Sequence, residues 1–162
     1  MTVTSPQREV TLRFLAEPSE ANFGGKVHGG TVMKWIDHAG YTCATGWSGR
    51  YCVTIYVGGI RFYQPVHIGD LVEVQARLIY TGHTSMHVAV DVRSGDPKER
   101  FMRKTTHCII IFVAVDRDGR PMPIPAFEPQ TEEDRALQEY AQKLMSLRKG
   151  IEEEMSRHLA ED

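Results

Sequence analysis

Regular alternation of apolar and polar side chains in the middle of the chain constrains its fold more than any other feature. Residues 71–81 carry apolar side chains at every second position, and residues 85–95 repeat this pattern after a short polar turn. Because successive side chains of a strand point to opposite faces, the spacing predicts two half-buried strands joined as a hairpin. The alternating apolar positions are Val72, Val74, Ala76 and Leu78, then Met86, Val88, Val90 and Val92.

Three further segments are predicted to join this sheet. Residues 10–14 alternate in the same way, residues 51–63 are rich in β-branched and aromatic side chains, and residues 106–115 are apolar on both faces, which is typical of a central strand. The glycine pair at 58–59 predicts a bulge or bend. The order of one strand, a helix and four strands, without βαβ repetition, predicts an α+β fold in which the helix packs on one curved antiparallel sheet.

That helix should begin near Gly30 and be mostly buried, and it contains one carboxylate, Asp37. An ionised carboxylate is costly to bury without a partner. Lys34, three residues earlier, is one possible partner, and the alternative is a partly exposed aspartate on a solvated edge. The apolar stripe of the helix comprises Val32, Ile36, Ala39 and Cys43, and other apolar residues extend it around the remaining faces.

The C-terminal part of the chain has helical periodicity. Thr131 with Asp134 predicts a capped start, and Gly150 is a possible break. The helix either docks on its own sheet or joins subunits, and we favour the subunit contact because the proline-rich residues 122–129 could act as a stiff spacer. We therefore divide the chain into a domain of residues 1–126 and a linker with a helical extension of residues 127–162. The apolar positions of this helix are Leu137, Tyr140, Leu144, Leu147, Ile151, Met155 and Leu159.

Composition excludes several classes of function. The 162 residues carry a formal charge of only −2 and no long run of one sign, which argues against binding to nucleic acid or to an anionic membrane. No apolar run approaches the roughly 20 residues that span a bilayer, and no secretion signal opens the sequence, so we expect a cytoplasmic protein. His83 and His87 stand four apart without a third ligand, so we predict no metal site. The odd set of cysteines, Cys43, Cys52 and Cys108, favours buried thiols over disulfides.

The glycines before the helix indicate a chemical role. Gly29 and Gly30 leave the amides of a helix start open to a developing oxyanion, as acyl transfer requires. Gly30 and Asp37 are seven residues apart, or about 10 Å along the axis, so one carbonyl group cannot easily reach both. If two such helices lie antiparallel across a two-fold axis, however, Asp37 of one subunit approaches Gly30 of the other. We therefore predict a composite site at a dimer interface.

Several motifs together resemble those of the hot-dog-fold acyl-coenzyme A thioesterases, specifically the acyl-CoA hydrolase group. They are NFGGKVHGG at residues 22–30 followed by Asp37, F-x-x-P-V-x-x-G-D at residues 62–70, and G-x-T-S-M at residues 82–86. The resemblance spans residues 8–126. It implies an antiparallel sheet wrapped around a long central helix, with the C-terminal helix as an addition. It also implies an acyl-CoA substrate, dimers with shared active sites and a trimer of dimers, which makes a homohexamer; a tetramer stays open.

The resemblance also implies roles for individual residues. Asp37 would act as general base or nucleophile, Asn22 of the partner subunit would orient the water or thioester, and the amide of Gly30 would bind the carbonyl oxygen. Coenzyme A is part of the substrate, and no cofactor is expected. The expected substrate contacts are His28, Gly29, Thr54, His83, Thr84 and Ser85, with His83 standing where the family usually has arginine.

Some alternatives stay open from the sequence. His28 either faces the substrate or only satisfies backbone groups of its loop. The acyl length, a preference for aryl groups and regulation by nucleotides are undetermined. A non-catalytic acyl-CoA sensor and a hydroxyacyl-thioester dehydratase of the same fold are the alternative functions.

Overall fold

The computed structural model describes residues 1–2 and 4–160, and the chain forms two compact units, Met1–Ala126 and Phe127–Asp162. The first unit contains one long helix and five strands. The second contains one long helix, α2 (Glu132–Leu159). The elements of the first unit are β1 (Glu9–Leu15), a 3-10 turn (Pro18–Glu20), α1 (Gly29–Ser48), β2 (Cys52–Phe62), β3 (Leu71–Thr81), β4 (Ser85–Gly95) and β5 (Arg103–Ala114).

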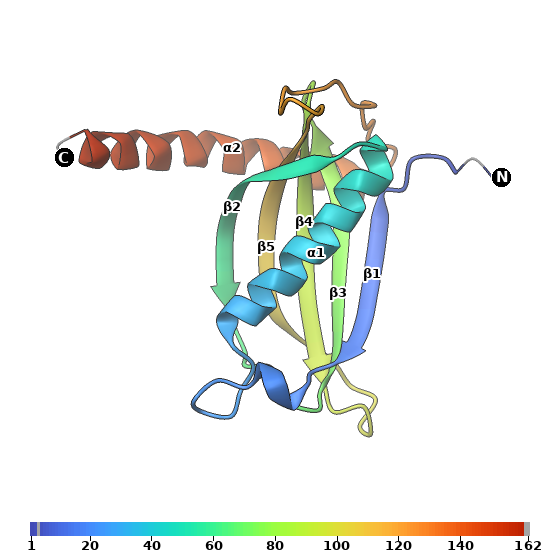
Figure 1. Cartoon of the computed structure of the whole chain (residues 1–162), viewed down its shortest axis with the longest axis vertical. Coiled ribbons are helices and arrows are strands. Elements are labelled where there is room, and N and C mark those ends of the chain that lie inside the picture. The colour runs from blue at the N-terminus through green and yellow to red at the C-terminus, as the bar shows by residue number, and fades with distance from the viewer. Residues whose placement is uncertain (3, 161–162) are drawn as a thin grey trace. The chain divides into compact units, whose positions relative to one another are not determined.

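The five strands form one antiparallel sheet in the order β1-β3-β4-β5-β2, and α1 lies across one face of it (Figure 1). The helix contacts every strand. The predicted α+β architecture is therefore confirmed, including the hairpin of β3 and β4 and the interior position of β5 in the sheet. The strand β2 lies at an edge beside β5, although it precedes β3 in sequence, because the connection at residues 63–70 crosses to the far side of the sheet.

Only one face of α1 is buried. Gly40 brings this face close to the sheet, since a Cβ atom built on it would lie 2.9 Å from both Ile110 and Phe112. The opposite face, which includes Met33, Lys34 and Asp37, is exposed. The prediction of a mostly buried helix is therefore wrong for a single chain, because one sheet covers one side of a helix. The buried residues of α1 are Val32, Trp35, Ile36, Ala39, Gly40, Cys43 and Ala44.

The edge strand β2 is irregular and carries exposed apolar side chains. Its pairing with β5 shifts register between Thr54 and Tyr56 and again between Gly58 and Arg61, and Gly59 has a φ of 64°. The predicted bend at the glycine pair is thus confirmed. Strands at a sheet edge have one row of unpaired backbone groups and are usually protected by charge or by a cover. In β2 the exposed large apolar side chains are instead Ile55, Val57 and Phe62.

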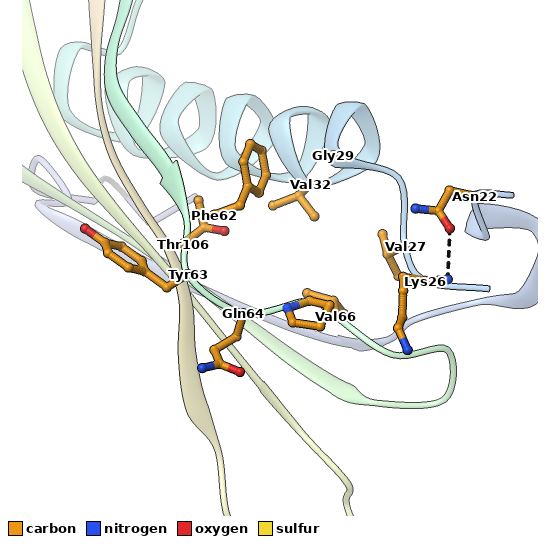
Figure 2. A pocket seen from close by; sticks show the side chains of 11 residues that line it. Asn22, Lys26, Val27, Gly29, Val32, Phe62, Tyr63, Gln64, Val66 and Thr106 are labelled. Atoms are coloured by element: carbon orange, nitrogen blue, oxygen red, sulfur yellow. Dashed lines mark hydrogen bonds between the residues drawn. The ribbon is translucent and has the colours of Figure 1, made fainter. Parts of the chain in front are cut away.

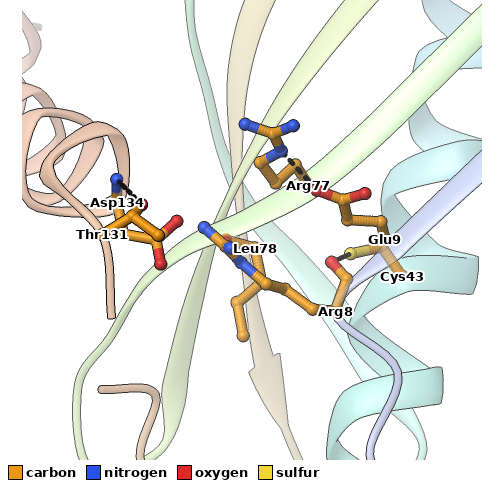
Figure 3. Close-up of polar contacts among 7 residues, drawn as sticks. All are labelled: Arg8, Glu9, Cys43, Arg77, Leu78, Thr131 and Asp134. Carbon is orange, nitrogen blue, oxygen red and sulfur yellow. Dashed lines mark hydrogen bonds and ion pairs between the residues drawn. The ribbon is translucent and has the colours of Figure 1, made fainter. Parts of the chain in front are cut away.

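Polar contacts tie β1 to its neighbours (Figure 3). The Nε atom of Arg8 donates to the carbonyl of Leu78 at 3.0 Å, and Glu9 pairs with Arg77 at 2.5 Å. On the other side the Cys43 thiol donates to the carbonyl of Arg8 at 3.2 Å. Burial raises the pKa of the Cys43 and Cys108 thiols to about 12. The prediction of buried free thiols is confirmed for Cys43, Cys52 and Cys108.

The helix α2 begins as predicted. The Thr131 hydroxyl accepts from the backbone N–H of Asp134 at 3.0 Å, which caps the first turn (Figure 3). Gly150 does not break the helix, so that expectation is wrong; one glycine costs only about 1 kcal/mol relative to alanine. In the described part of the chain, neither helix is long and apolar enough to cross a membrane. Exposed apolar side chains of the C-terminal half are Leu147, Ile151, Met155 and Leu159.

The proline-rich segment before Ala126 is attached to the first unit. Backbone N–H groups of Met122 and Ile124 donate to the carbonyls of Ala114 and His83, at 2.8 Å and 3.1 Å. The indole N–H of Trp47 donates to the carbonyl of Pro125 at 2.8 Å. Residues 122–125 therefore do not form the free spacer that the sequence indicated, because their carbonyls and amides find partners on the sheet and on α1.

Candidate functional site

The N-terminus of α1 presents open backbone amides. Its N-cap, His28, makes no side-chain hydrogen bond to the first turn. The first helical bond runs from the amide of Val32 to the carbonyl of His28 at 3.1 Å. A Cβ atom built on Gly30 meets nothing within 4 Å. A carbonyl oxygen can therefore approach the first-turn amides, where the positive end of the helix dipole favours developing negative charge.

A cavity of about 310 Å³ lies beside this helix end (Figure 2). It is bounded by the loop that precedes α1, the first turn of α1 and the residues that follow β2. Its walls are mainly apolar, and its volume falls at the small end of the range for ligand sites. The lining residues are Asn22, Lys26, Val27, Gly29, Val32, Phe62, Tyr63, Gln64, Pro65, Val66 and Thr106.

Asn22 both shapes the loop and offers a donor to this cavity. Its side-chain oxygen accepts from the amides of Gly24 and Lys26, at 2.9 Å and 3.0 Å. Because the oxygen is already occupied by the loop, the amide nitrogen is the group available to a ligand. Figure 2 shows that nitrogen turned toward the cavity.

Asp37 lies two helical turns from Gly30 and pairs with the edge strand. The Thr54 hydroxyl donates to its Oδ1 atom at 2.8 Å. Thr54, rather than the suggested Lys34, is therefore the partner of this carboxylate oxygen. Both Asp37 and Thr54 are exposed in the single chain. Of the two alternatives that the sequence left open for Asp37, the single chain therefore shows the exposed aspartate rather than a buried carboxylate.

The His28 side chain packs against an aromatic side chain of the loop that precedes α1. Its ring meets Phe23 edge-on, with the ring centroids 6.3 Å apart, and Phe23 is fully exposed. The backbone amide of His28 donates to the carbonyl of Glu20 at 3.0 Å. The imidazole is exposed and does not line the cavity.

The three residues His83, Thr84 and Ser85 lie at the turn between β3 and β4, far from the cavity. Ser85 pairs with Val113 of β5, whereas the cavity residue Thr106 stands seven residues away on the same strand. At the rise of a strand this separation is about 23 Å. One chain therefore holds the predicted residues in three groups: Asn22 with Gly29 and Gly30, Asp37 with Thr54, and the turn.

Most of the residues that line the cavity were not predicted from the sequence to belong to the site. Phe62, Pro65 and Val66 belong to the F-x-x-P-V motif, so the position of that motif after a predicted strand could have identified them. Thr106 stands in a central strand without any local signal. Whether Thr106 lines the cavity depends on the register between β2 and β5, because that register sets which residues lie opposite the helix end.

A separate charged cluster lies on β4 and β5. Asp91 pairs with His107 at 2.8 Å and with Lys104 at 2.9 Å. Burial raises the pKa of Asp91, but the hydrogen bonds and charges of these two partners outweigh it and lower the pKa to about 2. Within the described residues, no group of three or more His, Cys, Asp or Glu side chains is placed to hold a metal ion.

The curved sheet around a long helix, with open amides at the helix start and a carboxylate on its exposed face, defines a thioesterase of the hot-dog type. The sequence pattern of the thioesterase superfamily matches residues 24–101. The chain is 34% identical over 145 residues to protein VdlD of Helicobacter pylori, covering 90% of this chain and 83% of VdlD. The chain belongs to the thioesterase superfamily, which confirms the resemblance seen in its motifs.

Two further comparisons agree with this membership. The acyl-CoA thioester hydrolase YciA of Salmonella typhimurium is 36% identical over 126 residues, covering 75% of this chain and 93% of YciA. The crystal structure of an apo-hexameric acyl-CoA thioesterase superposes with a TM-score of 0.85 at 32% identity, covering 91% of this chain and 95% of that chain. The predicted hot-dog fold is thereby confirmed over nearly the whole chain.

Proposed function

We propose that this protein hydrolyses acyl-coenzyme A thioesters to a free carboxylic acid and coenzyme A. The observation that carries the proposal is the open amide end of α1 beside an apolar cavity, with a carboxylate two turns along the same helix. The similarity to YciA over 93% of its length supports the same activity. The acyl group would occupy the cavity, and the thioester carbonyl would meet the amide of Gly30.

Asp37 would supply the base for this reaction. It takes a proton from a water molecule while the water oxygen attacks the thioester carbon, and the resulting oxyanion is stabilised by the Gly30 amide. Collapse of the tetrahedral intermediate breaks the carbon–sulfur bond, and the coenzyme A thiolate leaves and takes up the proton. In the alternative route Asp37 itself attacks the carbon, and water then hydrolyses the mixed anhydride.

A complete site requires two copies of the chain. Gly30 and Asp37 are about 10 Å apart along the helix, which is too far for one carbonyl group. The exposed apolar edge of β2 favours antiparallel pairing with the β2 strand of a second copy. Such pairing brings opposite ends of the two sheets together. The turn at residues 83–85 of the partner subunit would then lie near the end of this sheet that holds the cavity. Asn22 of one chain would then act with Asp37 of the other.

The turn at residues 83–85 would bind the nucleotide part of coenzyme A, with Thr84 and Ser85 as donors to phosphate. His28 and Thr54 would contact the substrate near the reacting carbonyl. The hexameric thioesterase of similar structure supports a trimer of these dimers for this chain. Three buried free thiols are typical of a reducing compartment, so we place the enzyme in the cytoplasm.

Thiol release from a panel of acyl-CoA esters, acetyl to palmitoyl plus phenylacetyl, tests the proposal. Wild type should release coenzyme A and Asp37→Ala should not. The matched control is Asp118→Ala, because Asp118 is also an exposed aspartate but lies in the turn after β5. Tight binding of the esters without release by wild type would refute hydrolysis and favour a sensor.

A single turnover in ¹⁸O-labelled water separates the two routes. With Asp37 as base, the acid formed in the first turnover carries the label. With Asp37 as nucleophile and water attacking the Asp37 carbonyl of the mixed anhydride, the first acid carries an unlabelled oxygen from the enzyme, and the label enters the Asp37 carboxylate.

A further inference from the structure

One fully buried polar side chain of the cavity wall has no part in the proposed reaction. Thr106 of β5 is 1% exposed and lines the cavity, and its Oγ1 atom is buried without a hydrogen-bond partner among the described residues. Figure 2 shows its hydroxyl directed toward the space between Phe62 and Val32. The hydroxyl therefore faces the volume that an acyl group would fill.

An unpaired buried hydroxyl is unusual because it lost its water partners on folding without replacing them. The apolar side chains that share the cavity wall with Thr106, which include Val27, Val32 and Phe62, offer neither donor nor acceptor. A threonine hydroxyl can donate one hydrogen bond and accept others. The missing partner can therefore be an oxygen atom carried by a ligand in the cavity.

We propose that Thr106 determines specificity, so that the cavity favours acyl groups bearing a neutral oxygen substituent, such as hydroxyacyl groups, over plain alkyl chains. This inference rests on the proposed thioesterase function. A plain chain leaves the hydroxyl unpaired, and sites built around a buried polar group discriminate against analogues that cannot pair with it. A carboxylate is disfavoured at the same place, because one neutral hydroxyl does not compensate for the desolvation of a charge.

Ser94 provides a matched control. Its Oγ atom is also buried without a partner, and the residue is 1% exposed, but it lies on β4 and does not line the cavity. Removing either hydroxyl eliminates a buried polar atom that has no hydrogen-bond partner. Only the removal of Thr106 should change the choice of substrate.

The experiment compares kcat/KM for butyryl-CoA with that for its 2-, 3- and 4-hydroxybutyryl analogues. In wild type at least one hydroxy isomer should be preferred over butyryl-CoA. One hydrogen bond is worth about 3- to 10-fold, so Thr106→Val should reduce this preference by about that factor. Thr106→Ser, which keeps the hydroxyl, should retain the preference, and Ser94→Ala should leave it unchanged.

Three results would overturn the inference. Wild type could prefer no hydroxy isomer, or the preference could survive in Thr106→Val, in which case the hydroxyl binds only a fixed water. A preference for succinyl-CoA over every hydroxy isomer would assign the selection to Lys26, the cationic residue of the cavity wall. If butyryl-CoA and all its analogues show no release that depends on Asp37, the proposed function itself fails, which is a distinct outcome.

Discussion

Replacing Gly40 by alanine should destabilise the protein, although the same replacement at Gly46 in the same helix should stabilise it. A Cβ atom at position 40 would lie 2.9 Å from Ile110 and from Phe112, which are 1% and 0% exposed and cannot move freely. At position 46 the nearest atom is the Cβ of Gln7, at 3.4 Å, which is an ordinary contact. The two variants therefore share the gain in helix propensity but differ in overpacking.

The magnitudes follow from these contacts. Alanine gains up to about 1 kcal/mol over glycine within a helix, and overpacking a core costs about 1–3 kcal/mol. Gly46→Ala should raise the free energy of unfolding by up to about 1 kcal/mol. The free energy of unfolding of Gly40→Ala should be about 1–3 kcal/mol lower than that of Gly46→Ala. Urea unfolding followed by circular dichroism measures the difference, provided that all samples have the same chain concentration and m-value. Equal stability of the two variants would refute the close approach of α1 to β5.

Three further predictions concern assembly and charge. Co-expressed Asn22→Ala and Asp37→Ala chains should recover about a quarter of wild-type activity, since half of the dimers are mixed and each mixed dimer holds one intact site; no recovery above the separate variants would contradict a shared site. Val57→Lys should reduce the mass in solution to about half that of the wild-type assembly or less, because a charge on an edge strand opposes pairing within each dimer, and an unchanged mass would contradict pairing through β2. Ionised Asp91, whose pKa falls from 3.8 to about 2 on folding, should stabilise the protein above about pH 4, so the stability advantage of wild type over Asp91→Asn should disappear as the pH falls toward 2; an advantage independent of pH would contradict the ion pairing.

Much of the fold could be predicted because each strand has one buried face. The alternation in residues 71–81 and 85–95 gave β3 and β4, and the doubly apolar residues 106–115 gave the central strand β5. Thr131 predicted the start of α2 through a local capping bond. The strands are recognised from apolar side chains at every second position, and the helix cap is recognised from residues close in sequence. Neither pattern requires knowledge of distant contacts.

The failures have a different physical origin. Met33 and Tyr41 are apolar but exposed in one chain, so hydrophobicity alone could not separate a face that packs on its own sheet from a face left for another surface. Gly150 did not end α2 because the cost of one glycine is small beside the other bonds of a 28-residue helix. Thr106 could not be identified because its role depends on strand register.

The site could be predicted only in part. The motif from Asn22 to Gly30 correctly indicated open amides at a helix start, and the structure places Asn22 and Gly29 on one cavity. The partner of Asp37 was not predicted, because Thr54 is distant in sequence and reaches the helix only through the path of β2. The roles of His28 and of the turn at residues 83–85 stay predictions.

The three buried cysteines have a consequence for an enzyme whose product is a thiol. Coenzyme A released at every turnover, once oxidised to a disulfide, would exchange with any accessible protein thiolate and leave the enzyme covalently blocked. With the pKa of Cys43 and Cys108 near 12, almost no thiolate forms on them at neutral pH, and burial also restricts access to Cys52. The buried thiols of the native chain should therefore not form mixed disulfides with oxidised coenzyme A. A disulfide reagent added to the native protein should accordingly report released coenzyme A with little background from the enzyme.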